Sequence, residues 1–193
     1  MKILIYTHGR TGSSNLLATL CDLYQIEGIP EPFNKNLYEN VWKTEPPYQR
    51  GDPLPDDCIM KCITYQADGW IQRNAHEFDK IILLFRENFK ETTISARNAI
   101  EHGWADKYVP TEGVDKIKLA LTARHYWRLC DVMWHIGQNG VDSTIMWYED
   151  IYSGDYDKTF NTIKNIKEDL TKDEFDTVWE QYLKPEHRYR QEN

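Results

Sequence analysis

"MKILIYTHGRTGSSNLL", residues 1–17, places an apolar run directly before a polar turn and a leucine-rich segment. Residues 1–6 are rich in Ile and Leu, which is typical of a buried strand. From Ser14 onward leucines recur at helical spacing, and Gly28 is suited to follow the end of such a helix. The stretch therefore predicts a strand, a turn and a helix in succession.

The turn within this unit has the composition of an anion site. Arg10 stands two residues before Gly12, and the hydroxyl residues Ser13 and Ser14 follow. Backbone N–H groups at a helix N-terminus and the helix dipole both favour a negatively charged group. We expect this turn to hold a phosphate or a sulfate.

The remaining chain alternates between apolar runs and helical patterns. Further strands are predicted within residues 27–34 and at 58–65, 80–85 and 143–148, and helices at 67–78, 89–101, 114–136, 155–167 and 172–183. Irregular segments are predicted at 34–57 (a loop or lid), 102–113 (a loop) and 184–193 (a polar tail). Strands that alternate with helices predict a central parallel sheet with helices on both faces, in a single domain over residues 1–193.

Composition limits the classes of partner. The 193 residues include 23 Lys and Arg against 31 Asp and Glu, a net charge of −8. Proteins with a general affinity for nucleic acid or anionic membranes usually present a basic face, so we expect neither partner. The four cysteines follow no zinc or redox spacing, and no apolar run reaches the ~18 residues of a membrane span. We expect a soluble, cytoplasmic protein with reduced thiols; these features leave its oligomeric state open.

Ligands in parallel α/β sheets bind at the carboxyl ends of the strands, which makes the residue after strand 80–85 informative. Metal-dependent kinases often place an aspartate at such a strand end to help hold Mg²⁺, but this chain places Arg86 there. An arginine binds a phosphate directly through a bidentate contact. Alternatively, Arg86 is a solvated strand-end charge paired with Glu87 or Glu91. The first interpretation gives two anion sites on neighbouring strand ends, and therefore a ligand with two separated charged groups.

Four segments, in order, resemble the sulfotransferases that use 3′-phosphoadenosine 5′-phosphosulfate (PAPS). "YTHGRTGSSNLL" (6–17) resembles their 5′-phosphosulfate loop, and "KIILLFRENFKETTISARNA" (80–99) resembles their 3′-phosphate motif. "MWYEDIYSG" (146–154) is similar to their "YEDL" segment, and "EPF" (31–33) recurs in the trehalose-sulfating branch. The resemblance covers about the first 150 residues of the chain.

The resemblance implies a three-layer, P-loop NTPase-like fold and transfer of a sulfuryl group from PAPS to an acceptor hydroxyl, without a metal. It implies 3′,5′-ADP as the product and a small molecule or carbohydrate as the acceptor. Arg10 would stabilise charge on the leaving oxygen, and Arg86 and Ser95 would bind the 3′-phosphate, although Ser95 stands nine residues after Arg86 where eight is common. The 5′-phosphosulfate would be held by Arg10, Thr11, Gly12, Ser13, Ser14 and Asn15.

The acceptor needs a general base within hydrogen-bond reach. Many family members use a histidine, but in "MKCITY" (60–65) Lys61 is retained and Ile63 stands where that histidine would fall. Glu31 of the "EPF" segment is therefore the predicted catalytic base, and His8 is the reserve candidate. For adenine stacking, Trp70 and Trp104 are candidates.

Two other functions remain open from the sequence. One is an ATP- and Mg²⁺-dependent kinase with Asp150 as the metal carboxylate, although the turn lacks the Gly-Lys-Ser/Thr ending of an ATP-binding P-loop. The other is a binding protein that holds a nucleotide without catalysis. In either enzyme, we expect residues 34–57 and 102–113 to select the acceptor, because loops over a rigid sheet usually do so.

Overall fold

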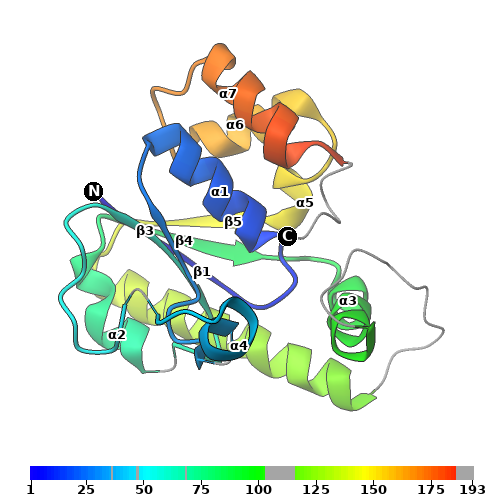
Figure 1. Ribbon diagram of the computed structural model, residues 1–193. Coiled ribbons are helices and arrows are strands. Elements are labelled where there is room, and N and C mark those ends of the chain that lie inside the picture. The colour runs from blue at the N-terminus through cyan, green and yellow to red at the C-terminus, as the bar shows by residue number, and fades with distance from the viewer. Residues whose placement is uncertain (36, 47, 68, 103–115, 186–193) are drawn as a thin grey trace.

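The computed structural model describes residues 1–35, 37–46, 48–67, 69–102 and 116–185 and contains one central sheet. Five strands form this sheet in the order β2-β3-β1-β4-β5, and every neighbouring pair is parallel (Figure 1). The strands are β1 (Lys2–Thr7), β2 (Gly28–Pro30), β3 (Cys58–Ile63), β4 (Lys80–Phe85) and β5 (Ser143–Trp147). The predicted α/β architecture with a central parallel sheet is confirmed.

The central position of β1 sets which residues lie next to the first turn. Its last residue, Thr7, pairs with Ile63 of β3 on one side and with Leu84 of β4 on the other. The interior strands are buried on both faces, which explains their nearly unbroken apolar sequences. As a consequence, the residues that follow β3 and β4 lie on either side of the turn after β1.

Helices cover both faces of the sheet, consistent with a three-layer fold (Figure 1). On one face, residues of β1 such as Ile3 and Ile5 pack against Leu16, Leu20 and Phe175. This layer contains α1 (Ser13–Tyr24), α5 (Tyr148–Ile151), α6 (Tyr156–Lys164), α7 (Lys172–Val178) and a π-helical turn, η3 (Trp179–Leu183). Alternation of side chains along β1 sends its other residues to the opposite face.

On that opposite face, Leu4 and Tyr6 of β1 pack against Trp70 and Leu129. This layer contains α2 (Trp70–Asn74), the 3-10 turn η2 (Ala75–Glu77) and α4 (Lys116–Gln138). Helix α3 (Phe89–His102) packs against α4, where the Thr93 hydroxyl donates a hydrogen bond to Thr122 Oγ1 at 3.2 Å.

The predicted irregular segments are only partly described by the structure. Residues 34–57 contain one π-helical element, η1 (Leu37–Trp42), which the Pro- and Gly-rich composition did not indicate. The predicted loop at 102–113 lies outside the described residues except for His102, and so does the tail 184–193 beyond residue 185. Within the described ranges, no helix is long and apolar enough to cross a membrane.

A glycine is required at position 12, where α1 begins. Gly12 has a φ of 69°, and a Cβ atom built there would lie 2.5 Å from Cε2 of the Tyr152 ring. The Tyr152 hydroxyl also donates a hydrogen bond of 2.6 Å to the Gly12 carbonyl. The ring therefore holds the turn from the side of α5 and leaves no room for a side chain.

We predict that Gly12→Ala lowers the free energy of unfolding by about 1–3 kcal/mol more than Gly140→Ala does, because overpacking adds to backbone strain. Gly140 is a matched control, since its φ is 66° and nothing lies within 4 Å of its Cβ position. Urea unfolding of both variants measures the difference. Equal losses of unfolding free energy would contradict the prediction, because they would mean that a Cβ atom at position 12 displaces the Tyr152 ring without a measurable energetic penalty.

Candidate anion-binding site

The turn between β1 and α1 is closed by buried hydroxyl groups. Thr7 Oγ1 lies 2.6 Å from Thr11 Oγ1 and 2.9 Å from the Leu84 carbonyl of β4. The Thr11 hydroxyl also lies 3.2 Å from the His8 carbonyl, which it can reach as a donor. These two side chains hold the turn together from below, whereas Ser14 at the start of α1 is exposed.

Three of the predicted site residues meet beside this turn. Arg10 Nε donates a hydrogen bond of 2.8 Å to Ser95 Oγ on α3. One terminal nitrogen of Arg86 donates a hydrogen bond of 3.1 Å to the Arg10 carbonyl. The structure thus brings Arg10, Arg86 and Ser95 into one cluster, although Arg86 and Ser95 come from a different strand and helix than Arg10.

The Arg86 guanidinium is only partly satisfied within the cluster. Its other terminal nitrogen lies 2.8 Å from Glu91 Oε2, and its Cζ atom lies 4.3 Å from the centroid of the Tyr148 ring. Its Nε, however, is buried and has no hydrogen-bond partner among the described residues. A buried donor without an acceptor is costly, so this nitrogen is a natural contact for an oxygen of a bound anion.

The cluster also concentrates positive charge. Burial lowers the pKa of Arg10, and the neighbouring Arg86 cation lowers it further. Two guanidinium groups that repel each other favour a shared anion between or beside them. The ion pair with Glu91 that the sequence left as an alternative is present, but it occupies only one edge of the Arg86 guanidinium.

A second polar cluster joins β3, α1 and the segment after β2. The Lys61 ammonium is buried, donates a hydrogen bond of 2.8 Å to Ser14 Oγ, and lies 2.9 Å from Glu31 Oε1. Glu31 Oε2 accepts hydrogen bonds of 2.9 Å each from Asn34 and Gln66. The predicted base is therefore connected to the anion turn through a lysine.

Lys61 was named from the sequence only as part of the resemblance, and neither Asn34 nor Gln66 was predicted to contact Glu31. The signal for Lys61 was present, because a lysine inside the apolar run "CIMKCI" (58–63) must find a partner when the strand is buried on both faces. No comparable signal marks Asn34 or Gln66, whose contacts depend on how two loops meet in space.

Four described residues other than glycine have positive φ values, Gln25 and Lys43 together with two residues that the sequence singled out for the site. Arg10 and Glu31 both have positive φ values, 68° and 46°, which are uncommon for residues other than glycine. Such strain costs of order 1–3 kcal/mol and concentrates at functional sites. The tight turn around each residue places its side chain, and the surrounding hydrogen bonds hold the strained conformation.

The Glu31 carboxyl is held in its charged form. Burial alone would raise its pKa, but the Lys61 charge and the hydrogen bonds from Gln66, Asn34 and Lys61 outweigh burial and lower the pKa below its ordinary value of 4.5. Glu31 is thus a carboxylate near neutral pH, able to accept a hydrogen bond.

His8, the reserve base, is buried beside the turn. Its ring centroid lies 5.5 Å from that of Tyr126 on α4, and its Nδ1 lies 3.0 Å from the Gly9 carbonyl. Burial lowers the pKa of His8 to about 4, so the ring is neutral near pH 7. Its Nε2 has no hydrogen-bond partner among the described residues.

The carboxylates of the "YED" segment are engaged by other parts of the chain. The Glu149 carboxylate accepts hydrogen bonds of 2.9 Å and 3.1 Å from the backbone N–H groups of Glu87 and Asn88, just before α3. Asp150 lies 2.8 Å from Lys158 on α6. Within the described part of the chain, no group of three or more His, Cys, Asp or Glu side chains is placed to hold a metal ion.

Of the two tryptophans predicted as candidates for adenine stacking, only Trp70 lies within the described residues, and it is buried in the core. Trp70 is only 3% exposed and packs among Phe33, Tyr48 and Phe78 in the core. Trp104 lies outside the described residues.

Asn15, predicted to contact the donor through its backbone, uses its side chain to donate a hydrogen bond of 3.2 Å to the Tyr182 carbonyl.

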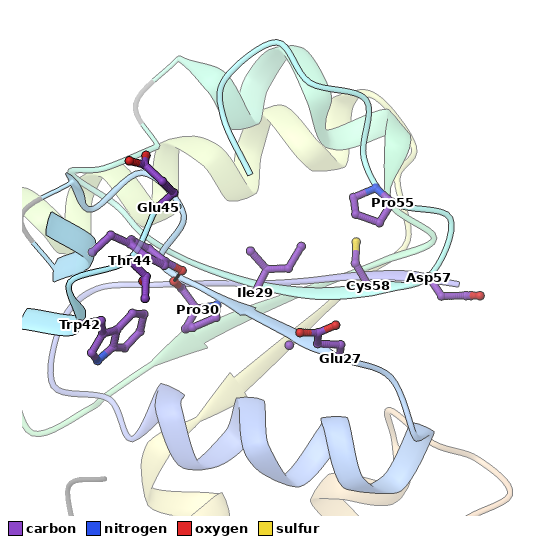
Figure 2. A pocket seen from close by; sticks show the side chains of 11 residues that line it. Glu27, Ile29, Pro30, Trp42, Thr44, Glu45, Pro55, Asp57 and Cys58 are labelled. Atoms are coloured by element: carbon purple, nitrogen blue, oxygen red, sulfur yellow. Dashed lines mark hydrogen bonds between the residues drawn. The ribbon is translucent and has the colours of Figure 1, made fainter. Parts of the chain in front are cut away.

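One cavity opens beside β2 and another is lined by the segment that follows β2, both at a distance in the chain from the turn. Figure 2 shows the first, of about 400 Å³, with Ile29 in its middle, Trp42 and Glu45 towards one end and Asp57 towards the other. The second, of about 410 Å³, is lined by residues between Pro32 and Arg50. It begins at the two residues that follow Glu31, in the region predicted to select the acceptor.

In comparisons with known proteins, the sequence matches no family model and no curated protein. Only the two polar clusters, that of Arg10, Arg86 and Ser95 and that of Lys61 and Glu31, then indicate a function.

We predict that the ionised Glu31 carboxylate stabilises the fold and that protonation of Glu31 at low pH removes this stabilisation. Because its folded pKa is lowered, its contribution is complete above about pH 4.5 and is lost as the pH falls through the folded value. Glu31→Gln leaves Lys61 buried without a counter-charge, at a cost of about 3–5 kcal/mol near pH 7. The difference from wild type should shrink as the pH falls towards 3.

Urea unfolding at a series of pH values measures this difference, with Glu168→Gln as the control because Glu168 is exposed. The Glu168→Gln chain should track the wild type throughout. A gap between wild type and Glu31→Gln that is unchanged from pH 7 to pH 3 would contradict a charge-based role for Glu31.

Proposed function

We propose that this protein is a sulfotransferase with a P-loop-like fold, which moves the sulfuryl group of PAPS to a hydroxyl of a small molecule or carbohydrate. The observation that carries the proposal is the cluster of Arg10, Arg86 and Ser95 beside the helix N-terminus after β1. It supplies two neighbouring anion sites, which fits a nucleotide with separate 5′ and 3′ charged groups.

The groups available to each site differ in kind. The turn offers the backbone N–H groups of residues 11–15 and the dipole of a helix of 12 residues. The second site offers the unpartnered Nε of Arg86 and the hydroxyl of Ser95. A 3′-phosphate oxygen would accept a hydrogen bond from Arg86 Nε, which has no acceptor among the described residues. PAPS supplies an activated sulfuryl group whose bond to the bridging oxygen breaks during transfer.

Arg10 reaches from the turn to α3 and so lies where both charged groups of the donor would be held. A guanidinium stays protonated, so Arg10 acts by charge and hydrogen bonds on the leaving oxygen. Lys61 orients the Ser14 hydroxyl at the turn while holding Glu31 on its other side. The turn and the predicted base are thereby kept in one arrangement.

Glu31 would receive the proton of the acceptor hydroxyl as the new sulfur–oxygen bond forms. Its lowered pKa keeps the carboxylate ionised near neutral pH, so that it can accept a hydrogen bond from the acceptor hydroxyl, and also makes it a weaker base than an ordinary glutamate. The second cavity, lined by Pro32 and Phe33, which follow Glu31 in the chain, is of a size suited to a small acceptor. The acceptor would then approach from the side of the 34–57 segment.

We predict that 3′,5′-ADP raises the melting temperature of the protein more than 5′-AMP or ATP–Mg²⁺ does, because only it carries the 3′-phosphate. A ligand at 100 times its Kd adds about 2.7 kcal/mol to the stability of the native state. Arg86→Ala should remove most of the advantage of 3′,5′-ADP over 5′-AMP. Arg73→Ala, an exposed arginine on α2, is the matched control and should keep it.

A thermal-shift titration distinguishes the candidate functions. A shift with ATP–Mg²⁺ alone would support the kinase in place of the sulfotransferase. A shift with 3′,5′-ADP that survives Arg86→Ala would show that the nucleotide binds elsewhere.

We also predict that Arg10→Ala slows turnover of PAPS by about 10²–10³-fold, the usual effect of removing one group that stabilises a developing charge. Turnover is measured as 3′,5′-ADP released in the presence of a mixed panel of sugars and small alcohols, with Arg73→Ala as the control. Full activity of Arg10→Ala would contradict its role. Binding of 3′,5′-ADP by wild type without turnover of any acceptor would favour the non-catalytic binding protein.

A further inference from the structure

Exposed apolar side chains gather on helix α4, and two of them are tryptophans. Trp127 and Trp134 are 75% and 61% exposed, although tryptophan is usually well buried. Leu119 and Leu121 on the same helix are also exposed. Four of the nine exposed large apolar residues in the described ranges therefore lie on α4.

These tryptophans are not part of the face that α4 presents to the sheet. Leu129, Val132 and Ile136 form that inner face and are at most 2% exposed. At 3.6 residues per turn, Trp127 and Trp134 lie on roughly the opposite side of the helix. Helix α4 thus has a second apolar face that the core does not use.

The outer face has the spacing of a helix-pairing seam. Residues recur along it at alternating intervals of three and four: Ala120, Ala123, Trp127, Cys130, Trp134 and Gly137. All are exposed except Cys130, which is half-buried. A repeat of this period keeps one stripe of a helix against a partner helix over its whole length.

The order of sizes along the seam fits an antiparallel copy of the same helix. In that arrangement, Trp134 of one copy faces Ala123 of the other, and Trp127 faces Cys130. Ala120 then faces Gly137 at both ends. Each indole meets a small residue, whereas a parallel arrangement would oppose each tryptophan to itself.

The charges beside the seam favour the same arrangement. Arg124 and Asp131 are exposed, lie on the same edge of the seam, and are one heptad apart. An antiparallel pair brings Arg124 of each copy close to Asp131 of the other, which gives two Arg–Asp ion pairs between the copies. This matters in a chain with a net charge of −8, whose copies otherwise repel each other.

The area available is sufficient for a stable contact. Helix α4 has 23 residues, which is about 35 Å at 1.5 Å per residue. A fully buried tryptophan removes roughly 150–250 Å² from water, and because Trp127 and Trp134 are 75% and 61% exposed, the four indoles of a pair would bury about 400–700 Å² on association. Specific interfaces bury about 1,200–2,000 Å² in total, and the flanking residues of both helices supply the rest.

We propose that two copies of this chain associate through α4, with the helices antiparallel and the tryptophans of each copy packed against small residues of the other. The inner face of α4 carries Tyr126, which contacts His8 beside the anion turn. The dimer would therefore brace the helix that lies behind the site while leaving the strand ends open.

Sedimentation velocity over a range of protein concentrations tests the proposal. Wild type should pass from monomer to dimer, and Trp127→Ala and Trp134→Ala should each raise the dimer Kd by about 30-fold or more, the effect of a buried tryptophan hot spot. Trp42→Ala is the matched control, because Trp42 is exposed on η1 and should leave the Kd unchanged. Circular dichroism of each variant checks that the chain is folded.

Charge reversal tests the antiparallel arrangement separately. Arg124→Asp and Asp131→Arg chains should each dimerise more weakly than wild type when alone, and an equal mixture of the two should recover dimers. The double variant Arg124→Asp/Asp131→Arg should also recover. These surface changes leave the core untouched, so they remain informative if a tryptophan variant fails to fold.

Three results would overturn the proposal. The first is a wild type that stays monomeric at every concentration, including one that binds vesicles of phosphatidylcholine and phosphatidylserine through α4 instead. The second is a dimer that the tryptophan variants leave unchanged. The third is a dimer that weakens with the tryptophan variants but shows no recovery on mixing the charge-reversed chains, which would rule out the antiparallel arrangement.

Discussion

Five parallel strands end at one edge of the sheet, and this constraint places every group of the proposed site (Figure 1). Because β1 lies between β3 and β4, the turn after β1 has Lys61 on one side and Arg86 on the other. Each of these cations then reaches the turn by a hydrogen bond, to Ser14 Oγ or to the Arg10 carbonyl. In an acidic chain, two cations are thereby brought to one turn, as the proposed anion site requires.

The buried ion pair of Lys61 and Glu31 ties together two parts of this edge. Removing either partner would leave an uncompensated charge in a place with little access to water, so the segment that carries Glu31 stays beside the start of α1, which carries Ser14. The positive φ of Glu31 is maintained by the same contacts. As the proposed base, Glu31 would then need no rearrangement before it meets an acceptor, which is the benefit of a preorganised site.

Local sequence determined the elements better than their contacts. The run "KIILLF" predicted β4 with its observed bounds, and the position of Arg86 after it followed directly. The contacts of Arg10 with Ser95 and of Lys61 with Ser14 join residues 85 and 47 positions apart, so they depend on strand order and not on any local pattern. The prediction that Trp70 could stack on an adenine was wrong, because the side chain packs in the hydrophobic core. The four-residue helix α5 was missed because its length is too short for a period to be seen.

A crystal structure of the protein with 3′,5′-ADP would show whether the turn and Arg86 hold the two charged groups of one nucleotide. We expect the 5′-phosphate to lie on the backbone N–H groups of residues 11–15 and the 3′-phosphate to accept hydrogen bonds from Arg86 Nε and Ser95. A nucleotide bound away from the turn would contradict this expectation. So would one whose 3′-phosphate lies far from Arg86 and leaves Nε without an acceptor, because the two-anion site would then have been assigned wrongly.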